Sequence, residues 1–178
     1  MELRIGQKVA YPNQGVCRVE ELENKTVGDC SIACYLLRVL GDNSKILVPV
    51  SNVASVGIRP VIGKDEYNRL IRNLEADFEE VCIDWKTRSR QFQEKLQTGD
   101  VFQAADVLKK LTFLSHEKRL SFREQTMLEK ARFLIVSEIA IADGRSDDEI
   151  DLKVRELVEF ACGKHHKSGS MAAAATVH

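Results

Sequence analysis

The chain has 178 residues, of which 44% are hydrophobic and 30% charged, and its formal net charge is −1 at pH 7. This composition is typical of a globular protein with a substantial core, and the length allows one ordinary domain or two small ones. Because no run of 18 apolar residues exists and residues 1–6 lack the apolar stretch of a signal peptide, we expect a cytoplasmic protein without a transmembrane helix.

Short apolar runs fill the first sixty residues. They cover residues 8–11, 16–20, 32–40 and 45–50, and we interpret the polar residues 23–25 as part of the break between the second and third runs. Strands this short and this closely spaced predict a small antiparallel β-barrel. Pro49 lacks an N–H group, which predicts that the last strand lies at a sheet edge or at its own end. Such an edge can accept a strand from another protein, and the alternative is an edge that is blunted and left unpaired.

A helical period replaces the strand pattern after residue 62. Capping residues and glycines delimit about five helices, expected at 64–76, 84–99, from 100 onward, at 122–143 and at 147–163. We therefore predict the α+β class, with the β-barrel over residues 1–62 and an all-helical domain over 63–163. The low-complexity residues 164–178, which include an alanine run, are expected to form a disordered tail.

The sequence offers no recognisable active site. It lacks a Gly-rich phosphate loop, a nucleophile elbow and paired metal-ligand spacing. The closest cysteine pair, Cys30 and Cys34, has no second pair or histidine nearby, and we interpret both as strand cysteines in a reducing compartment. His116 and Glu117 are interpreted as a solvated helix end, because catalysis needs a converging group of side chains. We expect a protein that is not an enzyme, with no catalytic residues, no metal and no cofactor.

Charge is distributed unevenly along the helical half. Between Trp85 and Arg132 the chain carries eleven Lys/Arg and six Asp/Glu, whereas residues 143–159 carry seven acids and three bases. A basic middle beside an acidic end favours a local anionic partner. Solvated faces of ordinary helices explain the same charges as well.

Trp85, the only tryptophan, is followed at once by Lys86, Arg88 and Arg90. At 100° per residue, Trp85 shares a helix face with Phe92 and Leu96, which favours an ordinary core position. If Asp84 caps the helix, however, Trp85 lies in the first turn and can project past the packed face. We therefore consider two interpretations, a core residue and a partly packed ring that presents its free edge to DNA. In the second, Lys86 and Arg90 on one flank and Arg88 on the other neutralise phosphates.

Further segments carry a pattern that is specific through order and spacing: Gly6-Gln7-Lys8-Val9-Ala10-Tyr11-Pro12 with Gly15, Val48-Pro49, Val56-Gly57-Ile58-Arg59, Trp85 with Arg88 and Arg90, Leu96-Gln97-Thr98-Gly99-Asp100, and Leu128-Glu129-Lys130-Ala131-Arg132. With these segments the chain resembles the CarD/CdnL family of bacterial transcription regulators over about residues 1–160. The resemblance implies a Tudor-like N-terminal domain that binds the RNA polymerase β subunit by strand addition. It also implies a helical domain that holds promoter DNA at the upstream end of the transcription bubble and stabilises the open complex of the primary sigma holoenzyme.

The same resemblance assigns the candidate site residues. Trp85 takes the position of a minor-groove wedge, with Lys86, Arg88 and Arg90 as DNA contacts, and the polymerase contacts fall on Lys25, Val27, Leu47 and Pro49. By this resemblance we expect a monomer that joins the nucleoid through polymerase and binds DNA largely independently of sequence.

Four positions depart from the family pattern. Leu47 stands where some relatives have an arginine, and Lys25 replaces an arginine, which keeps the charge but loses the bidentate fork. Thr87 occupies a position that is cationic in relatives, and Arg90 occupies one that is often lysine. The fold is therefore a safer expectation than the individual polymerase contacts.

The alternative function is a protein–protein adaptor without direct DNA contact. Salt distinguishes the two, because log affinity for DNA falls with log salt by about 0.9 per neutralised phosphate. An adaptor would show a flat salt response.

Overall fold

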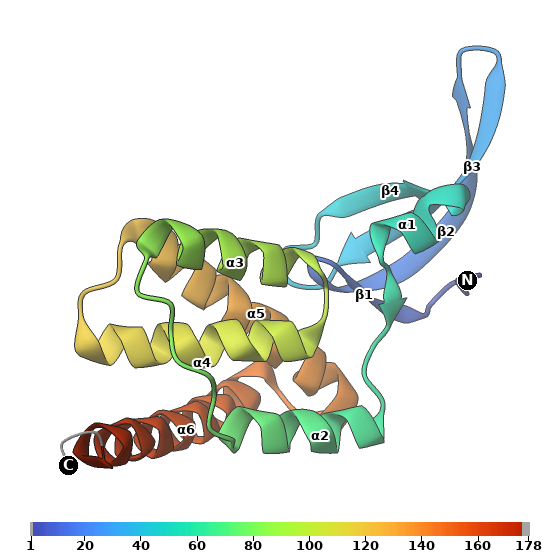
Figure 1. Cartoon of the computed structure of the whole chain (residues 1–178). Coiled ribbons are helices and arrows are strands. Elements are labelled where there is room, and N and C mark those ends of the chain that lie inside the picture. Colours follow the sequence, from blue (N-terminus) through green and yellow to red (C-terminus); the bar gives the residue numbers. More distant parts are fainter. Residues whose placement is uncertain (1, 176–178) are drawn as a thin grey trace.

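The computed structural model of the chain describes residues 2–175, except for the side chains of Val27 and of residues 168–175. Strands come first and helices follow (Figure 1). The strands are β1 Lys8–Tyr11, β2 Gly15–Val27, β3 Cys30–Val39, β4 Lys45–Pro49 and β5 Arg59–Pro60. They form one antiparallel sheet in the order β4-β3-β2-β1-β5. The predicted α+β class and the Tudor-like N-terminal sheet are confirmed, but the sheet is open, because among the described residues no pairing joins β4 to β5.

The inner face of the sheet carries a small apolar core. Val9, Cys17, Val19, Leu37 and Val48 are buried and pack together there. They come from four successive strands, as the alternation of apolar residues predicts. The last strand, β4, lies at the sheet edge, as expected from Pro49.

The hairpin of β2 and β3 is longer than predicted and projects from the sheet as an arm (Figure 1). Residues 23–25 lie inside β2, so the interpretation of this segment as a break is wrong. Lys25 pairs with Ile32 and Val27 with Cys30. Both side chains of the Lys25–Ile32 pair are exposed, so the arm lacks the buried apolar face that marks a strand in a sequence.

The helices are η1 Val50–Asn52, α1 Val53–Val56, α2 Lys64–Glu75, α3 Trp85–Gln97, α4 Val101–Glu117, α5 Phe122–Asp143 and α6 Asp147–Ala175. The five expected helices correspond to α2 to α6, and the short η1 and α1 were not expected. The five helices α2 to α6 share one continuous apolar core. Each of them contributes a buried residue: Leu70, Phe92, Leu108, Ile135 and Ile150. No described helix is long and apolar enough to cross a membrane.

The last helix does not end at Gly163 as predicted. It continues through Ala175, so the expected disorder of the tail is wrong as far as the described residues reach. Glycine inside a helix costs only about 1 kcal/mol relative to alanine. Contacts with the end of α2 hold the extension, since Lys164 Nζ donates to Glu75 O at 3.1 Å and His165 Nδ1 lies 2.8 Å from Asp77 Oδ1.

Arg59 joins the sheet to the helical part. Its Nη2 donates to the carbonyl of Gly99 at 2.8 Å and to the carboxylate of Glu138 at 2.9 Å. Glu138, on α5, also accepts from the N–H of Ile62 at 3.0 Å. A planar guanidinium that contacts the α3–α4 turn and α5 at once restrains rotation of the sheet about the connecting segment.

Close packing adds to this restraint. Phe133 of α5 lies against Gly15 and Gly41, where a methyl group on Gly41 would come within 2.6 Å of the ring. Gly99 has a φ of +75°, and a methyl group there would lie 2.8 Å from Pro12 Cγ. These contacts explain why glycines stand where α5 and the α3–α4 turn meet the sheet.

Candidate nucleic-acid interface

Helix α3 begins at Trp85, for which the sequence allows both a buried and an exposed position. Asp84 caps the helix, and its carboxylate accepts from the N–H of Thr87 at 2.9 Å. Contacts with the Thr87 side chain and N–H lower the pKa of Asp84. Trp85 is therefore the first helical residue and 61% of its surface is exposed, whereas Phe92 and Leu96 on the same face are buried. The core interpretation of Trp85 is wrong, because the packed face begins one to two turns later.

Two cations accompany Trp85 on the surface of α3. Lys86 Nζ lies 5.7 Å from the centroid of the indole ring, which is within cation–π range. Arg90 is exposed, and its ion pair with Glu94 is long, at 3.8 Å. Exposed pairs of this kind contribute little, so both cations can exchange to phosphate oxygens.

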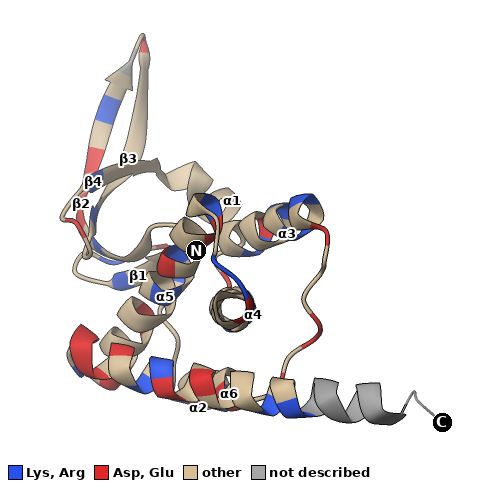
Figure 2. Cartoon of the chain, turned by 90° about the vertical axis from the view of Figure 1, so that its left-hand side faces the viewer, with Lys and Arg blue, Asp and Glu red and all other residues tan. Residues whose placement is uncertain are grey.

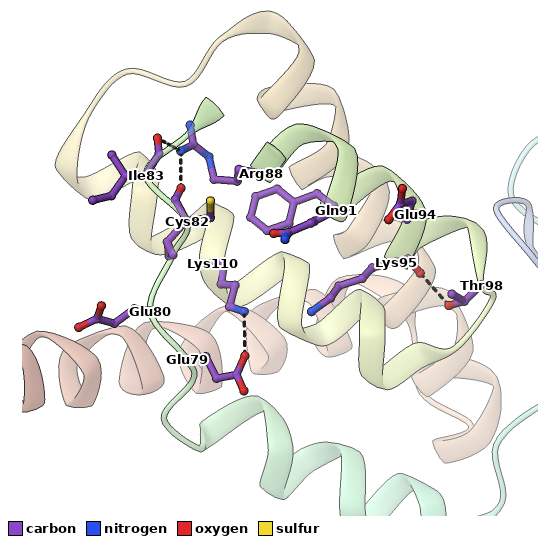
Figure 3. A pocket seen from close by; sticks show the side chains of 12 residues that line it. Glu79, Glu80, Cys82, Ile83, Arg88, Gln91, Glu94, Lys95, Thr98 and Lys110 are labelled. Atoms are coloured by element: carbon purple, nitrogen blue, oxygen red, sulfur yellow. Dashed lines mark hydrogen bonds and ion pairs between the residues drawn. The ribbon is translucent and has the colours of Figure 1, made fainter. Parts of the chain in front are cut away.

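Arg88 has a different position from the one predicted. Its side chain is only 4% exposed, and its Nη1 donates to the carbonyls of Cys82 at 2.7 Å and Ile83 at 3.1 Å (Figure 3). Its Nη2 donates to Glu124 Oε1 of α5 at 2.8 Å. The expectation that Arg88 flanks Trp85 as an exposed cation is therefore wrong. Arg88 instead fixes the segment that leads into Asp84 and Trp85.

Glu124 completes this buried link at the start of α5. Its Oε2 accepts from the Ser121 N–H at 3.0 Å and from the Ser121 hydroxyl at 2.9 Å, which forms a capping box. Burial alone would raise the pKa of Glu124. The hydrogen bonds from Ser121 and Arg88 and the charge of Lys118 outweigh burial and lower this pKa to about 2. The Arg88–Glu124 pair thus ties the start of α3 to the start of α5.

A second exposed aromatic residue stands at the start of α5. Phe122 directly follows the N-cap Ser121 and is 90% exposed. Both α3 and α5 begin at the same end of the helical part (Figure 1). The sequence analysis treats this segment only as the start of the helix expected at 122–143 and misses Phe122. The signal that could have identified Phe122 is the same as for Trp85: each is an aromatic residue directly after a helix N-cap.

The same end carries further basic residues. Arg119 in the α4–α5 turn and Arg123 on α5 are exposed, and Lys and Arg recur along α3 (Figure 2). Arg123 Nη2 donates to Gln93 Oε1 of α3 at 2.6 Å, so α3 and α5 lie side by side here. Exposed rings surrounded by cations from two helices suit a polyanion with stacked bases.

The predicted polymerase-binding residues lie elsewhere, on the sheet. Leu47 on the edge strand β4 is 44% exposed and Pro49 is partly buried. Lys25 is exposed on the hairpin arm and pairs with Glu23 at 3.3 Å. Val27 pairs through its backbone with Cys30, and its side chain lies outside the described part. By register, Leu47, Pro49 and Lys25 pair with Leu36, Cys34 and Ile32 of β3. These three residues of β3 are two positions apart and therefore point to the same face of the sheet. Lys25, Leu47 and Pro49 consequently share that face.

A hollow lies between the α2–α3 linker and helices α3 and α4 (Figure 3). It measures about 680 Å³, and carboxylates and cations both line it. Asp106 pairs with two of the cations, Lys95 Nζ at 2.6 Å and Lys110 Nζ at 3.1 Å. Among the described residues, no group of three or more potential metal ligands occurs.

Glu124→Gln tests the link between the two helices. The fall of its pKa from the ordinary 4.5 to about 2 corresponds to about 3 kcal/mol of stability at neutral pH. Because the pKa is lower in the folded state, this contribution is complete above about pH 4.5 and is lost as the pH falls towards about 2. Urea unfolding should show a large difference between Glu124→Gln and wild type at pH 7 that shrinks across this window. Glu129→Gln, an exposed change on the same helix, should show no such difference. A pH-independent difference for Glu124→Gln would contradict the assignment.

Comparisons with known proteins agree with this two-part arrangement. A family model for the CarD-like/TRCF RID domain matches residues 3–62, and a model for the CarD C-terminal domain matches residues 69–155. A relative described as a candidate transcription factor, YdeB of Bacillus subtilis (strain 168), is 26% identical over 147 residues, which cover 83% of this chain and 96% of the relative. Both matched domains occur in the order of the resemblance seen in the sequence. The chain belongs to the CarD-like family of transcription factors.

Proposed function

We propose that the protein regulates transcription by binding promoter DNA through the end of the helical part, with Trp85 as a wedge in the minor groove. The observation that supports this proposal best is the exposed indole at the first position of α3, behind which Arg88 is buried. Apolar side chains that enter a base step in the minor groove unstack it, and the extra contacts offset that cost. A ring on a fixed helix start loses less conformational entropy on binding than a ring on a mobile loop.

Phosphate binding falls to exposed cations in this proposal. Lys86 and Arg90 serve one side of the ring, and Arg123 on α5 adds a cation that the sequence reasoning did not include. Such contacts act on the backbone and carry no sequence information, so binding is largely independent of sequence. Arg88 leaves the set of DNA contacts, because its guanidinium is already used inside the protein. Its role is to position Trp85.

The regulatory effect follows from a difference in affinity. A ligand shifts an equilibrium only as far as it binds one state better than the other. A wedge fits a strained or opened base step better than an intact one, so the protein stabilises the open promoter complex over the closed complex. A differential contact of about 1.4 kcal/mol shifts this equilibrium about tenfold.

The sheet supplies the attachment to RNA polymerase. Strand β4 is an edge strand and exposes Leu47, so the β subunit of the polymerase can add a strand there. The match of residues 3–62 to the CarD-like/TRCF RID domain supports this assignment. Lys25 and Pro49 lie on the same face as Leu47 and extend the contact. The link through Arg59 then holds Trp85 at a fixed distance from the polymerase.

Trp85→Ala should shorten the lifetime of the open complex about tenfold, because stacking of one aromatic residue on a base is worth about 1–3 kcal/mol. The lifetime is measured by competitor challenge of the holoenzyme on a ribosomal-type promoter. Trp85→Phe, which keeps an aromatic ring, should retain part of the effect. Equal lifetimes with wild type and Trp85→Ala would exclude the wedge.

Leu47→Glu should weaken binding to a fragment of the polymerase β subunit at least fivefold, because an acidic group replaces an apolar contact at a position where some relatives carry an arginine. Titration calorimetry measures the affinity. The matched control is Leu152→Glu, which alters an exposed leucine on α6 and should leave the affinity unchanged. If both variants bind as tightly as wild type, β4 is not the polymerase-binding edge.

A further inference from the structure

A groove runs between α3 and α5 and ends at the turn after β1. It has a volume of about 350 Å³, and its lining residues are Asn13, Gln93, Leu96, Gln97, Phe122, Arg123, Thr126, Met127 and Lys130. Two of these residues are cations and none is a carboxylate. The groove therefore combines an apolar floor, amide groups and a positive charge, which complements a nucleotide in all three respects.

Phe122 stands on the wall of this groove. At 90% exposure, the side chain of Phe122 contributes almost nothing to folding through burial. The backbone of Phe122 is held at a defined place nonetheless, because Ser121 and Glu124 cap the helix on which it stands. An exposed aromatic side chain on a fixed helix start, beside Arg123, is a stacking platform.

The spacing between Phe122 and Trp85 limits what the two rings can contact together. Arg88 and Glu124 are in direct contact, and each lies within one helical turn of its aromatic residue. Packed helices lie about 8–10 Å apart, whereas base pairs in a duplex are stacked about 3.4 Å apart. At this spacing the two helix starts lie about two to three base steps apart. A strand that leaves the duplex at Trp85 can pass from one ring to the other.

We propose that the α3–α5 groove binds an unpaired nucleotide of the DNA strand that separates at Trp85, with Phe122 stacked on its base. Arg123 and Lys130 contact the phosphates of this strand. The amide groups of Gln93 and Gln97 donate to and accept from base edges without selecting one base. This proposal rests on the DNA-binding function proposed above and adds a single-strand site to it. The protein then stabilises the open complex through two contacts. Trp85 contacts the opened base step, and the α3–α5 groove contacts the strand that opening separates.

Binding of the full-length protein to two DNA probes tests the proposal. One probe is a blunt duplex, and the other is the same duplex with a single-stranded overhang of several nucleotides at one end. Fluorescence anisotropy should show that wild type prefers the overhang probe at least fivefold, as stacking on one base provides. Phe122→Ala should lose this preference and keep the affinity for the blunt duplex. Thr126→Leu, which fills the groove from an exposed position without adding an aromatic ring, should have the same effect.

Controls separate this proposal from the general DNA-binding function. Trp85→Ala should weaken binding to both probes, and an unchanged affinity for both would instead contradict the wedge. Phe160→Ala removes an exposed phenylalanine on α6 and should change neither affinity. Equal weakening of both probes by Phe122→Ala would make Phe122 a duplex contact and overturn the single-strand site. An intact overhang preference in both groove variants would also overturn it, and in that case reduced polymerase binding by the same variants would identify a protein as the occupant.

Discussion

A buried ion pair between Arg88 and Glu124 determines what the helical part presents to its surroundings. The pair is surrounded by hydrogen bonds, because Arg88 also donates to the carbonyls of Cys82 and Ile83 and Glu124 also accepts from Ser121. Replacing such a pair with apolar residues is often neutral for stability, whereas removal of one partner leaves a costly buried charge. The main effect of the Arg88–Glu124 pair is on the positions of the helices. It fixes two helix starts side by side, and each helix start exposes an aromatic residue.

The second constraint is the contact of Arg59 with Gly99 and Glu138, which connects the sheet to the helices. In the proposed function the sheet edge binds polymerase and the helix starts bind DNA, so each partner binds a different part of one chain. The effective concentration of the second site depends on how rigidly the parts are joined. A rigid connection allows the free energy of polymerase binding to hold Trp85 against one base step. A flexible connection would spread the ring over many positions and weaken its effect.

Part of this arrangement was predictable from the sequence, and the exceptions have physical reasons. The helical period correctly placed Phe92 and Leu96 in the core, since both lie inside the packed length of α3. It could not decide whether Trp85 is buried, because periodicity gives the angular position of a side chain around the helix axis but not the residue at which the packed part of the helix begins. The sequence pattern predicts Arg88 as a surface cation, because its buried carboxylate partner, Glu124, lies 36 residues further along the chain. Phe122 was missed although it occupies the same position after an N-cap as Trp85. The hairpin arm and the extension of α6 were misjudged because pairing and tertiary contacts, which leave no periodic signal, hold them.

In the proposed function, Trp85 is exposed in the free protein and becomes covered by DNA. The chain has one tryptophan, so its fluorescence reports on this residue alone. We expect red-shifted emission and easy quenching by acrylamide in the free protein, and a loss of quencher access when duplex DNA is added. This change should persist in Phe160→Ala, which alters an exposed ring elsewhere. Emission that is blue-shifted and protected before DNA is added, or quenching that DNA leaves unchanged, would contradict the account.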